Sequence, residues 1–445
     1  MAWTTEQVLA LAPDAASAKS GKDLSTPRKW ASLGANDACA WGSIQGSGKD
    51  PYKTSIDLAG PAFKCTCPSR KFPCKHGLGL FLILAQNPGS FAEKEPPPWT
   101  AEWMAKRAEK DAKKSGEAAA PAAPPDPEAE KKAALAAEKR AASREANVTA
   151  GLNELGIWLD DLVRHGFAGL PGKSSSFWWT PAARLVDAQA PGLARRTREL
   201  DGITTTGEDW PARLLREVSL LHLAREGWSR LATLPPATQA DLRATLGFTL
   251  SQEETLAQSG TRDQWLVLGQ RVEEEERLRT QRTWLFGLAS KKFALCLSFS
   301  ASPSQPLDLS LPPGMTIDAE LVYYPGSWPL RALVKQRSGS PATVAGALPH
   351  LTISDAIGSA AAAFTANPWL EGVPFALAAV TPLRRAAQWI VRDETGRGLP
   401  LDVSESKAWS LAALAGGRPL AMAGEWDGER LRPLSVWAEG RFLRA

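Results

Sequence analysis

The residues best suited to chemistry lie in one short stretch of this 445-residue chain. It holds three of the five cysteines and one of the four histidines, with the spacing Cys65-x-Cys67-x6-Cys74-x-His76. Thiolate sulfur and neutral imidazole nitrogen are the ligands that zinc prefers, and four of them in a tetrahedral array complete a structural site. Because four protein ligands leave no open position for water, such a site supports folding rather than catalysis. The spacing therefore predicts one structural Zn²⁺ ion.

Local geometry indicates which elements must position these ligands. Residues two apart on a strand face the same side, so Cys65 and Cys67 can hold one ion. On a regular helix Cys74 and His76 would point roughly 200° apart. We therefore expect Cys74 directly before a helix and His76 in the first turn of that helix. The helix should end at the Asn-Pro-Gly sequence of residues 87–89, which is a strong stop signal.

The sequence before the cluster contains short stretches with strand propensity, separated by turns that carry glycine and proline. We predict strands near residues 38–45, 52–57 and 62–67, and mainly helix in residues 1–35. Together with the helix that follows His76, we expect these strands to form a small ββ(β)α module, a ββα-type zinc unit around the site.

The spacing C-x-C-x6-C-x-H followed by an apolar helix resembles the SWIM zinc finger. The resemblance covers about residues 35–90, and all four ligand positions match. The preceding "WGSIQGSGKDPYKTSIDLAG" and the layout of the whole chain are similar to bacterial SWIM zinc finger family proteins of about this length. The resemblance implies zinc binding and contact with DNA or with another protein. For bacterial relatives it also implies partners such as a MoxR-type AAA ATPase or a von Willebrand A-type protein.

Basic residues surround the predicted ligands. Between Lys49 and His76 there are six lysines and arginines against two aspartates. These basic residues can balance the charge of three thiolates, contact phosphates beside aromatic rings that stack on bases, or bind a protein partner. We leave these roles open and predict that the contact residues are Lys64, Arg70, Lys71, Phe72 and Lys75.

Composition narrows the class of protein. A formal net charge of +4 from 52 basic and 48 acidic residues is too mild to indicate a nucleic-acid partner by itself. We expect no membrane span, because no run of eighteen apolar residues occurs. The first residues lack the basic region of a signal peptide. Sparse, odd-numbered cysteines favour a reducing cytoplasm over a secreted disulfide framework.

The chain divides into four predicted regions. Residues 1–92 carry the zinc module. Residues 93–147 form a linker with charged helices and an Ala/Pro-rich joint, and we expect this linker to decouple the module from the rest. Residues 148–262 look mainly helical because apolar residues recur at helical spacing. Residues 263–445 mix strands and helices. The predicted fold class is therefore α+β and multidomain, with a SWIM-like zinc module, a charged helical linker and a larger region that is helical first and α+β after.

Other segments contain residue types found in known catalytic or binding motifs, but they lack the spacing that those motifs need. The stretch "GSIQGSGKD" has one residue too many for a P-loop and an aspartate where the hydroxyl residue should follow the lysine. Ser174–Ser176 lack the Gly-x-Ser-x-Gly elbow of a hydrolase. His165, His222 and His350 stand singly.

The absence of a recognisable catalytic constellation predicts a non-enzymatic adaptor that uses the finger for protein–protein or nucleic-acid contact. One alternative is a DNA-binding protein that acts through the finger. A second alternative is an enzyme whose active site in residues 150–445 has no sequence motif.

Overall fold

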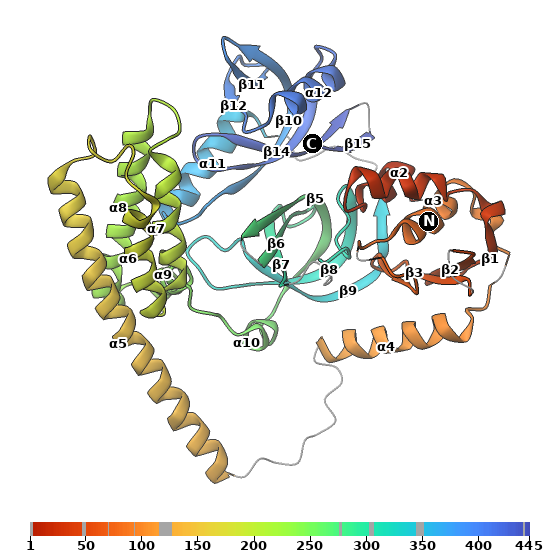
Figure 1. The fold of residues 1–445 in the computed structure, drawn as a ribbon, viewed down its shortest axis with the longest axis horizontal. Coiled ribbons are helices and arrows are strands. Elements are labelled where there is room, and N and C mark those ends of the chain that lie inside the picture. The colour runs from red at the N-terminus through yellow and green to blue at the C-terminus, as the bar shows by residue number, and fades with distance from the viewer. Residues whose placement is uncertain are drawn as a thin grey trace.

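The computed structural model describes residues 3–46, 50–69, 71–92, 94–114, 127–275, 278–301, 307–343, 351–438 and 441–445. A zinc module and a helical bundle lie on opposite sides of two antiparallel sheets (Figure 1). This arrangement confirms the predicted α+β, multidomain fold class. In the described part of the chain, no helix combines the length and apolarity that crossing a membrane would require.

The N-terminal module is a four-stranded antiparallel sheet in chain order with helices on one face. Its strands are β1 (Trp30–Ala35), β2 (Cys39–Ile44), β3 (Tyr52–Asp57) and β4 (Ala62–Cys65). Its helices are α1 (Thr5–Ala10), α2 (Ala15–Asp23) and α3 (Lys75–Gln86), with short 3₁₀ turns at Pro27–Lys29 and Pro88–Ser90. Helix α3 fills the module core, because eight consecutive residues of α3 are buried.

Strand β1 was missed by the sequence analysis, which placed mainly helix in residues 1–35. Its sequence, "WASLGA", contains few β-branched residues. It is a strand because it pairs with β2, with Trp30 opposite Ile44, and because Trp30 packs into the module core at 7% exposure. Tertiary context therefore overrides a weak local preference.

Helix α4 (Pro98–Lys114) falls in the predicted linker but packs on the module (Figure 1). The hydroxyls of Ser55 and Thr100 lie 2.9 Å apart, and Arg107 Nε donates to Asp57 Oδ2 at 2.9 Å. Both contacts lie on the face of β3 that points away from α3. Helix α4 therefore covers the second face of the small sheet.

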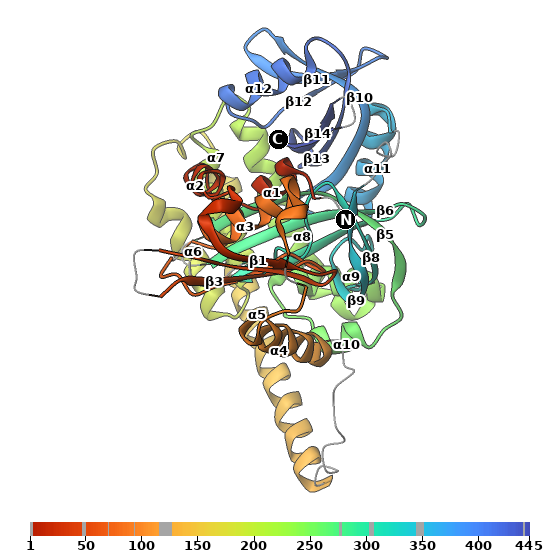
Figure 2. The same ribbon diagram turned by 90° about the vertical axis from the view of Figure 1, so that its right-hand side faces the viewer.

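Helix α5 (Pro127–His165) crosses the predicted boundary at residue 147 without a break. Its described side chains are exposed or half-buried up to Asn147, and Val148 is the first that is buried. Figures 1 and 2 both show the earlier part of α5 extending away from the bundle. The change in composition at residue 148 therefore marks where the helix enters a core, not where a helix starts.

The bundle packs the later part of α5 against four further helices. They are α6 (Ser175–Asp187), α7 (Pro191–Ile203), α8 (Trp210–Ser229) and α9 (Pro236–Leu246). A short 3₁₀ turn at Leu231–Thr233 and helix α10 (Gln252–Leu256) complete the helical region. Its core includes Leu152, Trp178, Leu193 and Leu242, each exposed by 1% or less.

Two antiparallel sheets follow the bundle. The first has the order β7-β6-β5-β8-β9 and the second the order β12-β11-β10-β13-β14-β15. The first contains β5 (Thr261–Glu275), β6 (Leu278–Gly287), β7 (Phe293–Ser300), β8 (Met315–Tyr323) and β9 (Ala332–Thr343). The second contains β10 (Val373–Arg385), β11 (Gln388–Asp393), β12 (Gly398–Pro400), β13 (Leu420–Trp426), β14 (Leu431–Ala438) and β15 (Arg441–Arg444). Helices α11 (Ile353–Ala366) and α12 (Glu405–Ala415) pack on β10.

The zinc module is not decoupled from the sheets, so that expectation was wrong. Met315, the first residue of β8, is 2% exposed and lies within the apolar core of the module. Leu309 packs against the same core, and Arg444 Nη1 donates to the carbonyl of Ala10 at 3.4 Å. Although the linker leads away from the module, apolar side chains more than two hundred residues further along the chain pack against the module core.

Candidate metal centre

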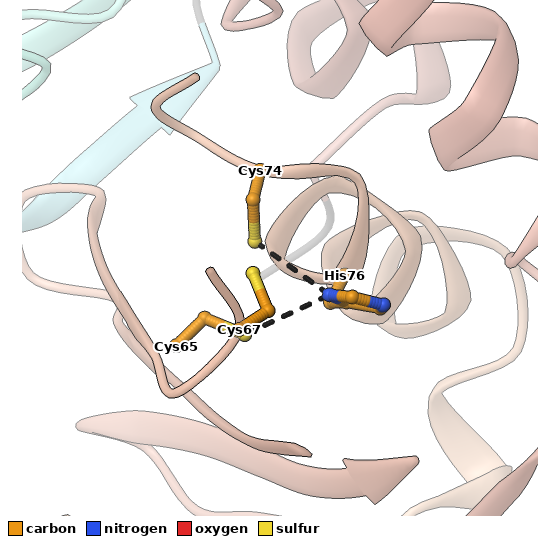
Figure 3. Close-up of side chains that lie close together, drawn as sticks. All are labelled: Cys65, Cys67, Cys74 and His76. Carbon is orange, nitrogen blue, oxygen red and sulfur yellow. Dashed lines mark hydrogen bonds between the residues drawn. The ribbon is translucent and has the colours of Figure 1, made fainter. Parts of the chain in front are cut away.

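The four predicted ligands come from three adjacent parts of the module (Figure 3). Cys65 is the last residue of β4, and Cys67 follows two residues later. Cys74 is the N-cap of α3, with extended backbone angles of φ −76° and ψ 167°, and His76 is the second residue of that helix. This confirms the expectation that Cys74 lies just before the helix and His76 in its first turn.

The ligand atoms converge on one point. One ligand atom from each of the four residues lies within 4.8 Å of all the others. His76 Nδ1 lies 3.8 Å from Cys65 Sγ and 4.0 Å from Cys74 Sγ. Tetrahedral zinc, with bonds of about 2.3 Å to sulfur and about 2.0 Å to nitrogen, separates its ligand atoms by roughly 3.5–3.8 Å. The four side chains therefore fit one structural zinc ion, and their number closes its coordination shell.

Residues of the neighbouring strand support the ligands. The ring of Tyr52 packs on His76 with centroids 5.1 Å apart, and Thr54 Oγ1 lies 3.2 Å from Cys65 Sγ. Neither was singled out as a support for the ligands by the sequence analysis. The period-two alternation of Tyr52 and Thr54 on β3 is the signal that could have placed both on the zinc side. Gly77 leaves room for Phe63, whose Cδ1 would lie 2.9 Å from an added Cβ.

The three thiols differ in proton affinity. Hydrogen bonding from Cys74, with further contributions from His76 and Thr54, lowers the pKa of Cys65 to about 4. That hydrogen bond to Cys65, together with burial, raises the pKa of Cys74. Burial is the main cause that raises the pKa of Cys67. Zinc uptake at neutral pH must therefore displace protons from Cys67 and Cys74, because zinc binds thiolates.

The sequence matches the SWIM zinc finger family over residues 64–85, the segment that contains this centre. The chain therefore contains a SWIM zinc finger. Its residues 143–246 match the SWIM-associated four-helix bundle domain, which the sequence analysis had described only as mainly helical. This second match begins in α5 shortly before Val148 becomes buried and ends with α9. Searches of curated proteins and of solved structures gave no match.

The predicted contact residue Lys64 lies on the opposite side of the sheet from the zinc ligands. In the register of β3 and β4 it is opposite Ser55, whose hydroxyl contacts Thr100 of α4. Strand alternation places Cys65 on the other face. Lys64 is exposed but belongs to the α4 side of this SWIM module. Arg70 lies outside the described residues.

The remaining predicted contact residues lie between Cys67 and His76, but they differ in how free they are to contact a partner. Lys71 is exposed and forms an ion pair with Asp14 at 2.8 Å. Phe72 is half-buried and packs edge-on against Phe63, with centroids 6.1 Å apart. Lys75 is exposed in the first turn of α3. The described members of the predicted set therefore do not share one face of the SWIM finger, because Lys64 lies on the α4 side of the sheet.

The stretch "GSIQGSGKD" connects two antiparallel strands, with Ile44 opposite Tyr52. A P-loop instead joins a strand to a helix. The antiparallel pairing of β2 with β3 is therefore inconsistent with a P-loop here. Residues 47–49 within the stretch lie outside the described residues.

Among the described residues, the isolated serines and histidines are not brought together into one site. Ser174 precedes α6, and its hydroxyl lies 2.7 Å from that of Ser176. His165 is exposed at the end of α5, and His222 is exposed on α8. His350 lies outside the described residues. In the described part of the chain, Cys65, Cys67, Cys74 and His76 are the one histidine- and cysteine-bearing group arranged to hold a metal.

Proposed function

We propose that this SWIM protein is a zinc-binding, non-enzymatic adaptor that contacts a protein partner through its helical bundle, while the finger shapes a second contact surface. The observation that carries the proposal is a set of exposed apolar side chains on the bundle. Trp179 and Val186 lie seven residues apart on α6, and 55% and 49% of their surfaces are exposed. Residues seven apart share one helix face. Exposed apolar side chains that share a face are typical of protein-binding surfaces.

The closed zinc centre supports the non-enzymatic part of the proposal. Four protein ligands give zinc a structural role, because no coordination position remains for substrate or water. The finger therefore contributes a shaped surface that includes Lys75, rather than a reactive metal. By resemblance alone, the partner classes to test first are a MoxR-type AAA ATPase and a von Willebrand A-type protein.

DNA contact through the finger is the second candidate. It is favoured by the excess of six basic over two acidic residues between Lys49 and His76. Two features weaken it: the charge of Lys71 is paired with Asp14, and Lys64 lies on the opposite face of the sheet from Cys65. A phosphate-binding surface would need these charges on one side.

The decisive experiment compares two tryptophans of equal exposure. Trp179 on α6 and Trp409 on α12 are both 55% exposed. The zinc-loaded full chain and the variants Trp179→Ser and Trp409→Ser would be tested against purified candidate partners and lysate of the expressing cells. We expect Trp179→Ser to lose a partner that the wild type and Trp409→Ser retain.

The same preparations would be tested for retention on double-stranded DNA at low and high salt, with and without a chelator. Salt-sensitive DNA binding that requires zinc and weakens in Lys75→Glu, together with equal partner capture by both tryptophan variants, would overturn the adaptor proposal in favour of DNA contact.

A further inference from the structure

The two sheets that follow the bundle share one strand order. In both, the strands lie in the order third, second, first, fourth and fifth along the chain: β7-β6-β5-β8-β9 in the first sheet and β12-β11-β10-β13-β14 in the second. In both, a parallel bridge within or directly beside the strands joins the third strand to the fifth; the bridges link Leu295 to Arg331 and Leu401 to Leu431. This order, antiparallel except at that bridge, is the topology of the five-stranded Greek-key barrel called the OB fold.

The first strand of each set supports the barrel topology. β5 and β10 are the longest described strands of their sheets, with 15 and 13 residues. Each has a register shift, between Val267 and Gly269 in β5 and between Leu377 and Val380 in β10. Such irregularities bend a strand, so that one long strand can serve both sides of a small barrel. We call β5–β9 the first barrel and β10–β14 the second barrel.

The outer face of the first three strands is covered in the first barrel. Trp265 and Val267 of β5 point into the core of that barrel. The alternate residues Leu266 and Leu268 belong instead to a core that includes strands of the second barrel. The hydroxyl of Ser435 on β14 donates to the carbonyl of Leu268. The second barrel therefore occupies this face of the first.

The same face of the second barrel is open to solvent. Trp389 and Val391 of β11 belong to the apolar core, so strand alternation places the residues between and beside them on the outer face. With their partners on the neighbouring strands, the outer face comprises Thr381, Leu383 and Arg385 of β10, Gln388, Ile390 and Arg392 of β11, and Gly398 and Pro400 of β12. Figures 1 and 2 both show β11 and β12 at an outer end of the molecule, away from the zinc module.

The outer face of the second barrel carries two arginines and no acidic side chain. Arg385 and Arg392 are exposed, and neither has an ion-pair partner among the described residues. The turn that follows β11 adds one acid and one base, Glu394 and Arg397, so the positive excess remains. Exposed guanidinium groups without a partner can contact phosphates and can also stack on bases.

Two aspartates near this face do not cancel its charge. Asp402 accepts from Arg432 Nε at 2.6 Å. Asp393 is buried and accepts from the backbone amides of Thr395 and Arg397 at 3.0 and 3.1 Å. Both carboxylates are therefore already engaged within the protein.

We propose that the outer face of the second barrel binds single-stranded nucleic acid. Arg385 and Arg392 contact phosphates, and unstacked bases pack on the apolar side chains between them, Leu383, Ile390 and Pro400. OB barrels bind oligonucleotides or oligosaccharides on the face of their second and third strands. The unpaired arginines favour the charged polymer over a neutral sugar chain. This site does not depend on the adaptor function proposed above.

Arg384 and Arg385 provide a matched pair of variants, because consecutive strand residues point to opposite faces. Arg385 lies on the outer face, whereas Arg384 pairs with Glu405 of α12 at 3.3 Å on the other side of β10. Both side chains are exposed, so Arg384→Gln and Arg385→Gln remove the same charge at little cost in stability.

The experiment is a fluorescence anisotropy titration of the zinc-loaded full chain with a labelled single-stranded oligothymidylate of about 15 nucleotides, within the site size of an OB barrel. We expect saturable binding with a slope of log K against log salt of about −1.4 for two phosphate contacts. Arg385→Gln and Arg392→Gln should each weaken binding roughly fivefold and halve this slope, whereas Arg384→Gln should match the wild type.

Competitors and a chelator test the assigned ligand and place. An unlabelled duplex of the same length and a neutral maltooligosaccharide should fail to displace the labelled strand at concentrations at which the unlabelled single strand displaces it. A chelator should leave binding unchanged, because the outer face of the second barrel lies apart from the zinc module.

Three results would overturn the proposal: no saturable binding of the single strand, equal affinities in the wild type, Arg385→Gln and Arg392→Gln, or displacement by the duplex or the oligosaccharide. Binding that is lost with the chelator and in Lys75→Glu, but kept in Arg385→Gln, would also overturn it, because the finger would then hold the nucleic acid.

Discussion

The zinc centre and the ion pair between the two sheets place charged groups in the protein interior in different ways. In the centre, three cysteines and one histidine within twelve residues surround one metal position. In the ion pair, Arg282 Nη2 donates to Glu425 Oε1 at 2.8 Å across 143 residues of sequence. Arg282 and Glu425 are 8% and 6% exposed. The first arrangement needs an added ion to balance its charge, and the second balances itself.

The two arrangements also hold different things together. The zinc ligands join the end of β4 to the start of α3 within one module. Arg282 and Glu425 join β6 of the first sheet to β13 of the second, and Arg195 of the bundle pairs with Glu371 nearby. Local chemistry therefore shapes the finger, whereas long-range charge pairing fastens the larger units to one another.

Loss of the metal should have the largest effect on the stability of the fold. Cys74→Ser removes a ligand, so we expect loss of the single zinc equivalent and unfolding of the module, because structural zinc contributes on the order of 10 kcal/mol in small fingers. Metal analysis and hydrogen exchange of the full chain would measure both. Cys39 is buried but lies outside the cluster, so Cys39→Ser should retain zinc. A metal-free Cys74→Ser protein with wild-type exchange in α3 would contradict the structural role.

Removal of one partner of the ion pair between Arg282 and Glu425 should have the next largest effect on stability. Glu425→Ala removes the nearest carboxylate of Arg282, leaving Glu371 at 3.8 Å, and also removes a partner of Arg271 at 3.3 Å. It should lower the free energy of unfolding by about 3–5 kcal/mol. Glu273 also pairs with an arginine, Arg271, but its side chain is 47% exposed. Glu273→Ala should therefore cost less than about 1 kcal/mol. Urea unfolding of both variants tests the difference, and equal losses would show that burial of the pair is unimportant.

The smallest expected effect is a change in stability at acidic pH. Burial alone would raise the pKa of Glu371, but the charges of Arg195, Arg196 and Arg282 outweigh it and lower the pKa. A lowered carboxylate pKa stabilises the fold above the unfolded value of about 4.3, and this stabilisation is lost as pH falls through the folded pKa. Because 44% of the Glu371 side chain is exposed, we expect about 1 kcal/mol or less.

Glu371→Gln should therefore be less stable than the wild type at neutral pH and about equal to it near pH 3, by urea unfolding at both values. If the difference between the two proteins grew on acidification, the assigned direction of the pKa shift would be wrong.

The zinc ligands were predictable because strand alternation and helix capping act over a few residues. The same alternation places Phe63 and Cys65 on one face of β4, so the position of Lys64 on the other face was available from the sequence as well. The α+β order and the hairpin turned at Gly428, whose φ is +102°, were likewise local signals.

The rest depended on contacts that no local pattern specifies. Strand β1 exists because β2 pairs with it, and Met315 reaches the module core from the far end of the chain. A cavity of about 260 Å³ forms where Arg282 of β6 and Tyr324, just after β8, meet the bundle. Such convergence follows from tertiary topology, so sequence spacing could not reveal it.

Helix α5 gives the molecule a mechanical element. Its 39 residues correspond to a rod of roughly 58 Å at about 1.5 Å per residue. The bundle holds the rod from Arg144 and Glu145, which contact Gly247 and Arg243, and packs its core on the rod from Val148 onward. A helix, unlike a glycine- and serine-rich chain, transmits tension and torque without first being stretched straight. A force that pulls on the linker end of α5 is therefore transmitted along the helix to Val148 and Leu152, inside the SWIM-associated bundle.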